Sequence, residues 1–137
     1  SKDSLENLLK EHGYNITNQR LLVFETLMTK APVSIKELID KLANKIDRVS
    51  VYRTVGTFEK IGIIQRVNVG WKYKIELSDK FVDHHHHLIC IKCREIIDIN
   101  DGNIELYISQ IANKHSFDVQ SHQVEAQGYC KDCREVK

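Results

Sequence analysis

Two Cys-x-x-Cys pairs constrain the fold of this chain more than any other feature of its sequence. The first pair is Cys90 and Cys93, the second is Cys130 and Cys133, and 36 residues separate them. Four thiolates brought together in this way form the tetrahedral set that zinc takes in closed, structural sites. We therefore predict a structural Zn²⁺ site that holds the C-terminal segment against the middle of the chain.

Other uses of paired cysteines agree less well with the sequence. Disulfides belong to oxidising compartments, whereas neither a signal peptide nor an apolar run of membrane-spanning length is seen, so a cytoplasmic protein is expected. A redox pair would stand beside a βαβ unit, which the sequence does not indicate. Zinc deaminases have proline before the cysteine pair, where this chain has Ile89, and no His-Glu-x-x-His motif is present. The chain is therefore not expected to be an enzyme.

Charged and metal-ligating residues are distributed unevenly along the chain. Residues 1–70 hold 11 lysines and arginines against 8 aspartates and glutamates, while residues 71–137 hold 9 against 11. All four cysteines and six of the seven histidines lie in the second part. We predict two domains, residues 1–78 and residues 79–137, of which the first is mildly basic and the second is rich in metal ligands.

The first domain begins with apolar residues at helical spacing. The predicted helices span residues 4–12, 18–29 and 35–45. Gly13 is placed to end the first helix, and Thr17 is a suitable N-cap for the second. Ser34 and Glu37 have the spacing of a capping box at the start of the third helix.

A fourth helix, from about residue 49 to 61, is the one expected to enter a DNA groove. Val51, Val55 and Phe58 share its inward face, so helical geometry turns the remaining side chains outward. The residues on the outward face or at its edge are Tyr52, Arg53, Gly56, Thr57 and Lys60. A long basic donor among small residues is typical of groove docking, and double-stranded DNA is the predicted partner. A solvated helix face with ordinary charges is the alternative interpretation.

A β-hairpin is predicted directly after these helices. Residues 63–77 alternate between apolar and polar side chains around a turn at Asn68–Gly70. Several short helices followed by a two-stranded hairpin give the element order of a winged helix-turn-helix.

Four consecutive histidines, residues 84–87, lead into the first cysteine pair. On a strand, alternate side chains share a face, so His85 and His87 point one way and His84 and His86 the other. The further ligands available nearby are Glu76, Asp98, Glu105 and His122. Because the histidines point to two faces, we predict two further metal sites. Nitrogen and carboxylate ligands suit zinc, iron, manganese, nickel or cobalt better than copper(I). A polar strand with solvated histidines is the alternative.

Taken together, these motifs resemble the ferric uptake regulator (Fur) superfamily of metal-responsive bacterial repressors. The stretches that carry the resemblance, in the family's order, are NITNQRLLVFETL, VSVYRTVGTFEKIGII, HHHHLICIKCREIIDI and SHQVEAQGYCKDC. The resemblance implies an α+β fold, with an N-terminal winged helix-turn-helix followed by a small α/β dimerisation domain that carries a four-cysteine zinc site. It also implies a homodimeric repressor of metal-ion homeostasis genes with no membrane partner. A regulatory metal would close the dimer on an AT-rich palindromic operator.

The resemblance assigns roles to particular residues. The structural zinc ligands would be Cys90, Cys93, Cys130 and Cys133. The regulatory site would use Glu76, His85, His87 and Asp98. A second site would use His84, His86, Glu105 and His122. The DNA-binding residues would be Tyr52, Arg53 and Arg20, with Thr57 and Lys60 beside them. The implied cofactors are a structural Zn²⁺ and a regulatory Fe²⁺, Mn²⁺, Zn²⁺ or Ni²⁺.

The chain departs from the family pattern at two positions. Pro32 stands where the family usually supplies a histidine to the regulatory site, and proline has no ligand atom. His86 stands where the family often has a carboxylate, which would favour zinc or nickel at the second site. The alternatives are a peroxide-sensing regulator of the same family, a zinc-dependent enzyme, and a zinc-ribbon adaptor that binds only protein.

Overall fold

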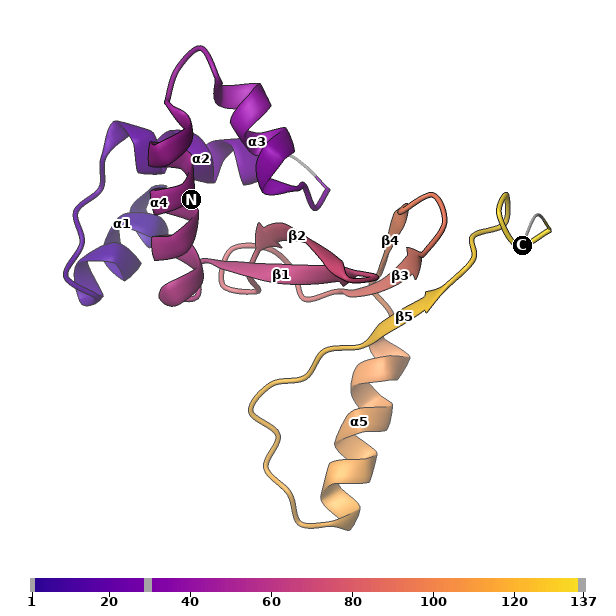
Figure 1. Cartoon of the computed structure of the whole chain (residues 1–137). Helices are drawn as coiled ribbons and strands as arrows, with labels where there is room; N and C mark the ends of the chain where they lie inside the picture. The colour runs from indigo at the N-terminus through magenta and orange to yellow at the C-terminus, as the bar shows by residue number, and fades with distance from the viewer. Residues whose placement is uncertain (1, 29–30, 136–137) are drawn as a thin grey trace. The chain divides into compact units, whose positions relative to one another are not determined.

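The computed structural model describes residues 2–28 and 31–135, and the contacts within the chain divide it into two units, Ser1–Asp83 and His84–Lys137. The elements of the first unit are α1 (Lys2–Glu11), α2 (Asn18–Met28), α3 (Ile35–Leu42), α4 (Arg48–Lys60), β1 (Ile64–Val69) and β2 (Lys72–Leu77) (Figure 1). The elements of the second unit are β3 (His86–Cys90), β4 (Ile96–Ile99), α5 (Gly102–Lys114) and β5 (Glu125–Gly128). The mixed α+β fold class is confirmed, while the domain boundary after residue 78 stays a prediction.

The helix boundaries follow from the capping residues. Gly13 follows α1 with a φ of +82°, a conformation that side chains other than glycine rarely adopt. The backbone N–H of Arg20 donates to the Thr17 hydroxyl over 3.1 Å, which confirms the N-cap of α2. At α3, the Glu37 N–H donates to the Ser34 hydroxyl over 3.0 Å and the capping box is complete. The predicted end of the second helix at residue 29 lies outside the described residues, and α3 ends at Leu42, earlier than predicted.

The core of the first unit is apolar and continuous. Val51 and Phe58 are fully buried and Val55 is nearly so, which confirms the inward face predicted for α4. They pack with side chains from the other helices and the hairpin, among them Leu5, Leu9, Val23, Phe24, Leu38, Ile63, Ile75 and Leu77. Each fully buried side chain of this size contributes about 1.5–3 kcal/mol by leaving water. This core holds α4 so that its opposite face stays exposed.

The wing is an antiparallel hairpin whose loop begins two residues later than the turn that the sequence predicted. Asn68 pairs with Tyr73, and Val69 with Lys72, so the loop consists of Gly70 and Trp71. Gly70 has a φ of +64°, which a two-residue hairpin loop requires and which glycine adopts at little cost. The predicted turn began too early because Asn68 and Val69 are still paired with the opposite strand.

The second unit contains a three-stranded sheet in the order β4-β3-β5. Helix α5 lies between β4 and β5 in the sequence. Strands β3 and β4 are antiparallel, and β3 and β5 are parallel, with Cys90 opposite Gly128. This pairing brings the segment after β5 to the end of β3, where the first cysteine pair lies. None of the helices within residues 2–28 and 31–135 is long and apolar enough to cross a membrane.

Candidate metal sites and nucleic-acid interface

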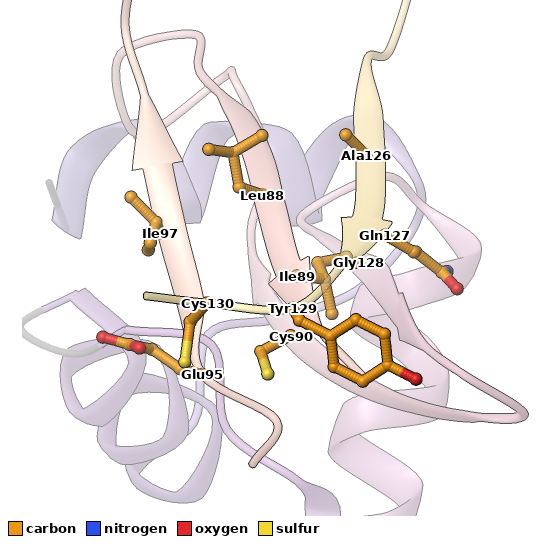
Figure 2. Close-up of a pocket in the computed structure, with 10 residues that line it drawn as sticks. All are labelled: Leu88, Ile89, Cys90, Glu95, Ile97, Ala126, Gln127, Gly128, Tyr129 and Cys130. Carbon is orange, nitrogen blue, oxygen red and sulfur yellow. The ribbon is translucent and has the colours of Figure 1, made fainter. Parts of the chain in front are cut away.

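The four cysteines come together at the end of the β3–β5 pair. Their sulfur atoms all lie within 4.8 Å of one another, and the Sγ atoms of Cys93 and Cys130 are 3.7 Å apart. Sulfur atoms bound tetrahedrally to zinc at about 2.3 Å are about 3.8 Å apart, so the spacing fits this ion. Figure 2 shows Cys90 and Cys130 next to each other at one end of a pocket of about 180 Å³ on the sheet.

The thiol pKa values show that the cluster favours one thiolate and resists further ionisation. Backbone N–H groups of Cys93 and Cys130 donate to the sulfur of Cys90 and lower its pKa to about 6. Hydrogen bonding with Cys130 raises the pKa of Cys133 to about 12. A divalent cation would compensate the repulsion among four thiolates, because coordination removes the proton from a thiol outright. The donor set therefore suits a metal ion.

A second cluster gathers the histidines of one strand face around a carboxylate. The Nε2 atom of His86 lies 2.6 Å from Oε1 of Glu105, and the Nε2 atom of His122 lies 2.6 Å from Oε2. The Nε2 atom of His84 lies 3.4 Å from Oε1 of the same carboxylate. The Nε2 atoms of His84 and His122 are 3.2 Å apart. The ligand atoms come from the start of β3 and the residues just before it, from the first turn of α5 and from the segment before β5. All four predicted residues of the second site are thus brought together.

Electrostatics favours the ionised form of Glu105. Burial raises the pKa of this carboxyl, but the hydrogen bond from His86 and the positive potential of His122 and His84 outweigh it. The net pKa lies below the ordinary value. Glu105 therefore provides a negative charge among nitrogen donors, as a divalent ion requires.

The other two histidines lie on the opposite face of the strand. The rings of His85 and His87 pack edge to face with centroids 4.8 Å apart, which confirms the alternation predicted for the run. Asp98 pairs with His87 in the β3–β4 ladder, and its Oδ1 lies 3.7 Å from His87 Nε2 and 4.0 Å from His85 Nε2. These three predicted regulatory ligands are brought together within the second unit.

The fourth predicted regulatory ligand, Glu76, belongs to β2 of the first unit. Its side chain is buried, and the amide of Gln65 on β1 donates to its Oε2 over 2.7 Å. Sequence reasoning missed Gln65, although the cross-strand register places it directly opposite Glu76. A joint site of Glu76 with the histidines stays a prediction.

The exposed side of α4 forms a polar groove with the start of α2. The groove encloses about 270 Å³. Its lining residues are Thr17, Asn18, Gln19, Arg20, Ser50, Arg53, Thr54 and Thr57. Arg20 is held in place because its Nη1 donates to the Asn15 carbonyl over 2.6 Å and its guanidinium lies 5.3 Å from the Tyr14 ring centroid. Hydroxyls, guanidinium groups and a helix N-terminus together suit an anionic phosphate.

The predicted DNA-binding residues do not all line this groove. Arg20, Arg53 and Thr57 line it, whereas Tyr52 is exposed elsewhere on α4 and Lys60 lies at the helix end. Sequence reasoning missed Ser50 and Thr54, which share a helix side with Arg53 and Thr57. Extending the outward face by i+3 and i+4 spacing would have found them.

A winged helix-turn-helix with a polar groove, followed by a sheet that gathers cysteines and histidines, defines a metal-binding regulator of the DNA-binding class. The profile of the Ferric uptake regulator family matches residues 11–127. The chain therefore belongs to the ferric uptake regulator family. Members of this family are metal-responsive, DNA-binding transcriptional regulators that function as dimers, and they are not enzymes.

Individual relatives agree with this assignment. The ferric uptake regulation protein of Klebsiella pneumoniae is 35% identical over 137 residues, covering 93% of this chain and 86% of that protein. The Helicobacter pylori regulator Fur, whose structure is described as revealing three functional metal binding sites, superposes with a TM-score of 0.82 at 26% identity. That match covers 97% of this chain and 93% of the other. A zinc-bound manganese uptake regulator is 32% identical with a TM-score of 0.66, covering 93% of this chain and 98% of that one.

Proposed function

We propose that this chain is a cytoplasmic, homodimeric repressor of metal-ion homeostasis genes that binds an AT-rich palindromic operator when its regulatory metal is present. The main support for this proposal is that the four consecutive histidines point alternately to two sides, His84 and His86 to one and His85 and His87 to the other. Each face meets its own carboxylate, Asp98 or Glu105. Separate donor sets of this kind in a winged-helix regulator support metal sensing in addition to a structural metal.

The cysteine cluster would hold a structural Zn²⁺. A closed four-sulfur site has no open coordination position for chemistry, so this ion would stabilise the fold. The regulatory ion would be Fe²⁺, Mn²⁺, Zn²⁺ or Ni²⁺, bound by Glu76, His85, His87 and Asp98. Mixed nitrogen and oxygen donors accept all four of these ions. A relative that carries zinc and is named for manganese uptake supports the same range.

The DNA interface would combine the polar groove with the exposed side of α4. Arg53 would read a base edge in the major groove, a contact that contributes about 1–3 kcal/mol of discrimination when it is bidentate. Tyr52 would pack against a neighbouring base. Arg20, Thr57 and Lys60 would hold the phosphate backbone, which sets the position of the protein without reading sequence.

Pro32 changes how a metal would act on the DNA-binding unit. With proline at this position, Glu76 would be the ligand through which a regulatory ion pulls on that unit. Val33 and Ile75 exchange two backbone hydrogen bonds of 3.0 and 2.7 Å, which join the start of α3 to the strand that carries Glu76. A force on Glu76 would therefore reach α3 through the backbone, and this supports metal control without the histidine.

Paired measurements of DNA affinity and metal content test the DNA-binding role. Arg53→Gln should weaken binding to an AT-rich palindromic duplex by about 5- to 150-fold, since it removes a contact of about 1–3 kcal/mol. Metal content should stay the same. Lys114→Gln, at the end of α5 in the second unit, removes the same charge from outside the winged helix and serves as the matched control. Equal loss of affinity in both variants would contradict the proposed interface.

A further inference from the structure

Both ring nitrogens of His86 already have partners within the protein. The backbone N–H of Val124 donates to Nδ1 over 3.2 Å, and Nε2 lies 2.6 Å from Oε1 of Glu105. The side chain is 2% exposed, so water does not compete for these positions. His86 therefore differs from a histidine whose ring is free to turn toward a metal.

These two contacts decide where the ring proton lies. Nδ1 accepts a hydrogen bond, so it must present its lone pair and cannot carry a proton. The proton of the neutral imidazole is then on Nε2, which donates it to Glu105. A metal ion at Nε2 would need the lone pair of that same atom. The ring would then have to lose its remaining proton or give up the bond from Val124.

His122 offers a matched comparison within the same cluster. Its Nε2 lies at the same distance, 2.6 Å, from the other oxygen of Glu105. Within residues 2–28 and 31–135, however, no backbone amide donates to its Nδ1, and its side chain is 23% exposed. His122 can therefore carry its proton on Nδ1 and present Nε2 to a metal. Its 3.2 Å distance from His84 Nε2 is close to the roughly 3.3 Å between two nitrogens on one tetrahedral zinc.

We propose that His86 is a positioning residue that holds Glu105, and that the second cluster binds a divalent ion through His84, His122 and Glu105. Water would complete the coordination shell. This inference rests on the proposed function, because it takes the cluster to be a metal site, and it replaces the expectation that His86 is a ligand.

The role proposed for His86 explains why histidine can stand where the family often has a carboxylate. A carboxylate there would only accept hydrogen bonds and would repel Glu105 until a cation arrived. The Nε2–H of His86 instead donates to Glu105 in a short, charge-assisted hydrogen bond. The ligand Glu105 is thus held in place before the ion binds, as outer-shell donors do in other metal sites.

Nitrogen chemical shifts of the histidines test the proposal without any substitution. Long-range ¹H–¹⁵N spectra would be recorded on the full chain with only the cysteine site loaded, and again after Zn²⁺ addition. His84 and His122 should change to the pattern of a metal-bound Nε2, while His86 keeps its proton on Nε2. A zinc-bound Nε2 with the proton on Nδ1 of His86 would overturn the proposal.

Two matched variants give an independent test by calorimetric titration with Zn²⁺. Both would be made in a His87→Ala background, which removes one proposed ligand of the regulatory site. His86→Gln keeps a donor toward Glu105 and should weaken binding by less than about tenfold, while His122→Gln should weaken it by about 100-fold or more. Equal losses would make His86 a ligand, and binding unchanged by His122→Gln would mean that no metal binds there; either result overturns the proposal. If the protein did not bind the operator, the nitrogen shifts and the Zn²⁺ affinities would still be unchanged. The proposed function and the proposed role of His86 can therefore be rejected independently.

Discussion

The two units of the chain are stabilised in different ways. In the first, one continuous apolar core joins the helices to the wing, and its fully buried side chains include Phe24, Phe58 and Ile63. In the described part of the second, the buried apolar side chains are Ile89, Cys90 and Ala112. A unit with so little buried apolar area needs further stabilisation from metal ions or a partner subunit.

The surface of the second unit points in the same direction. Its exposed large apolar side chains are Leu88, Ile91, Ile97, Leu106, Tyr107, Ile111, Phe117, Val124 and Tyr129. Apolar side chains in this number are what a dimerisation unit exposes as a single subunit. Loss of metal should therefore act first on the second unit, while the first unit keeps its fold.

Loss of the zinc ion proposed for the cysteine cluster should have the largest effect of any single change. Structural zinc contributes about 10–16 kcal/mol of apparent binding free energy in small zinc-binding peptides, far more than a side chain in a core. Cys133→Ser should therefore expose the amides of the second unit to hydrogen exchange, measured by mass spectrometry, while those of the first unit stay protected. Lys131→Ser, in the same segment but without a ligand atom, should change neither. Protection of β3 and β5 in Cys133→Ser would contradict the comparison.

A cavity in the core of the first unit should have the next largest effect. Phe58→Ala should lower the free energy of unfolding by about 3–5 kcal/mol, because it removes a fully buried ring. Denaturant unfolding followed by circular dichroism would measure it. Tyr52→Ala replaces an aromatic residue on the exposed side of the same helix and should cost about 0.5 kcal/mol. Similar losses in the two variants would show that the buried core does not dominate the stability of this unit.

The capping box of α3 should contribute a smaller amount. Ser34→Ala removes the hydroxyl that accepts the Glu37 N–H and should cost about 1 kcal/mol of unfolding free energy. Ser121→Ala, in an exposed segment of the second unit, is the control and should have almost no effect. Identical unfolding midpoints for Ser34→Ala and the unaltered chain would show that the cap adds nothing measurable.

Sequence reasoning succeeded where a local pattern determines local structure. Helix caps such as Thr17 and Ser34 act within one turn, and the alternation of the histidines follows from strand geometry alone. The meeting of the two cysteine pairs was also predictable, because their shared chemistry requires it.

Sequence reasoning failed where partners are distant and their chemistry is general. The amide of Val124 bonds to His86 across 38 positions of the chain, and any residue except proline could supply that amide. Gln65 meets Glu76 only because of the register of the hairpin, and a turn at Asn68–Gly70 would give a different register. Backbone donors and strand register carry no signature in residue type, so the details around each ligand had to come from the structure.

Operator binding as a function of added metal is the most direct test of metal control in this repressor. Fluorescence anisotropy with an AT-rich palindromic duplex would be measured at fixed salt, first with chelator and then with Fe²⁺, Mn²⁺, Zn²⁺ or Ni²⁺ added singly. We expect one of these ions to tighten binding by about 5–150-fold, the usual range of coupling between two sites, and His87→Ala to abolish that gain. An operator affinity that stays the same with every metal would contradict metal control, because an ion that shifts no equilibrium between conformations cannot control the repressor.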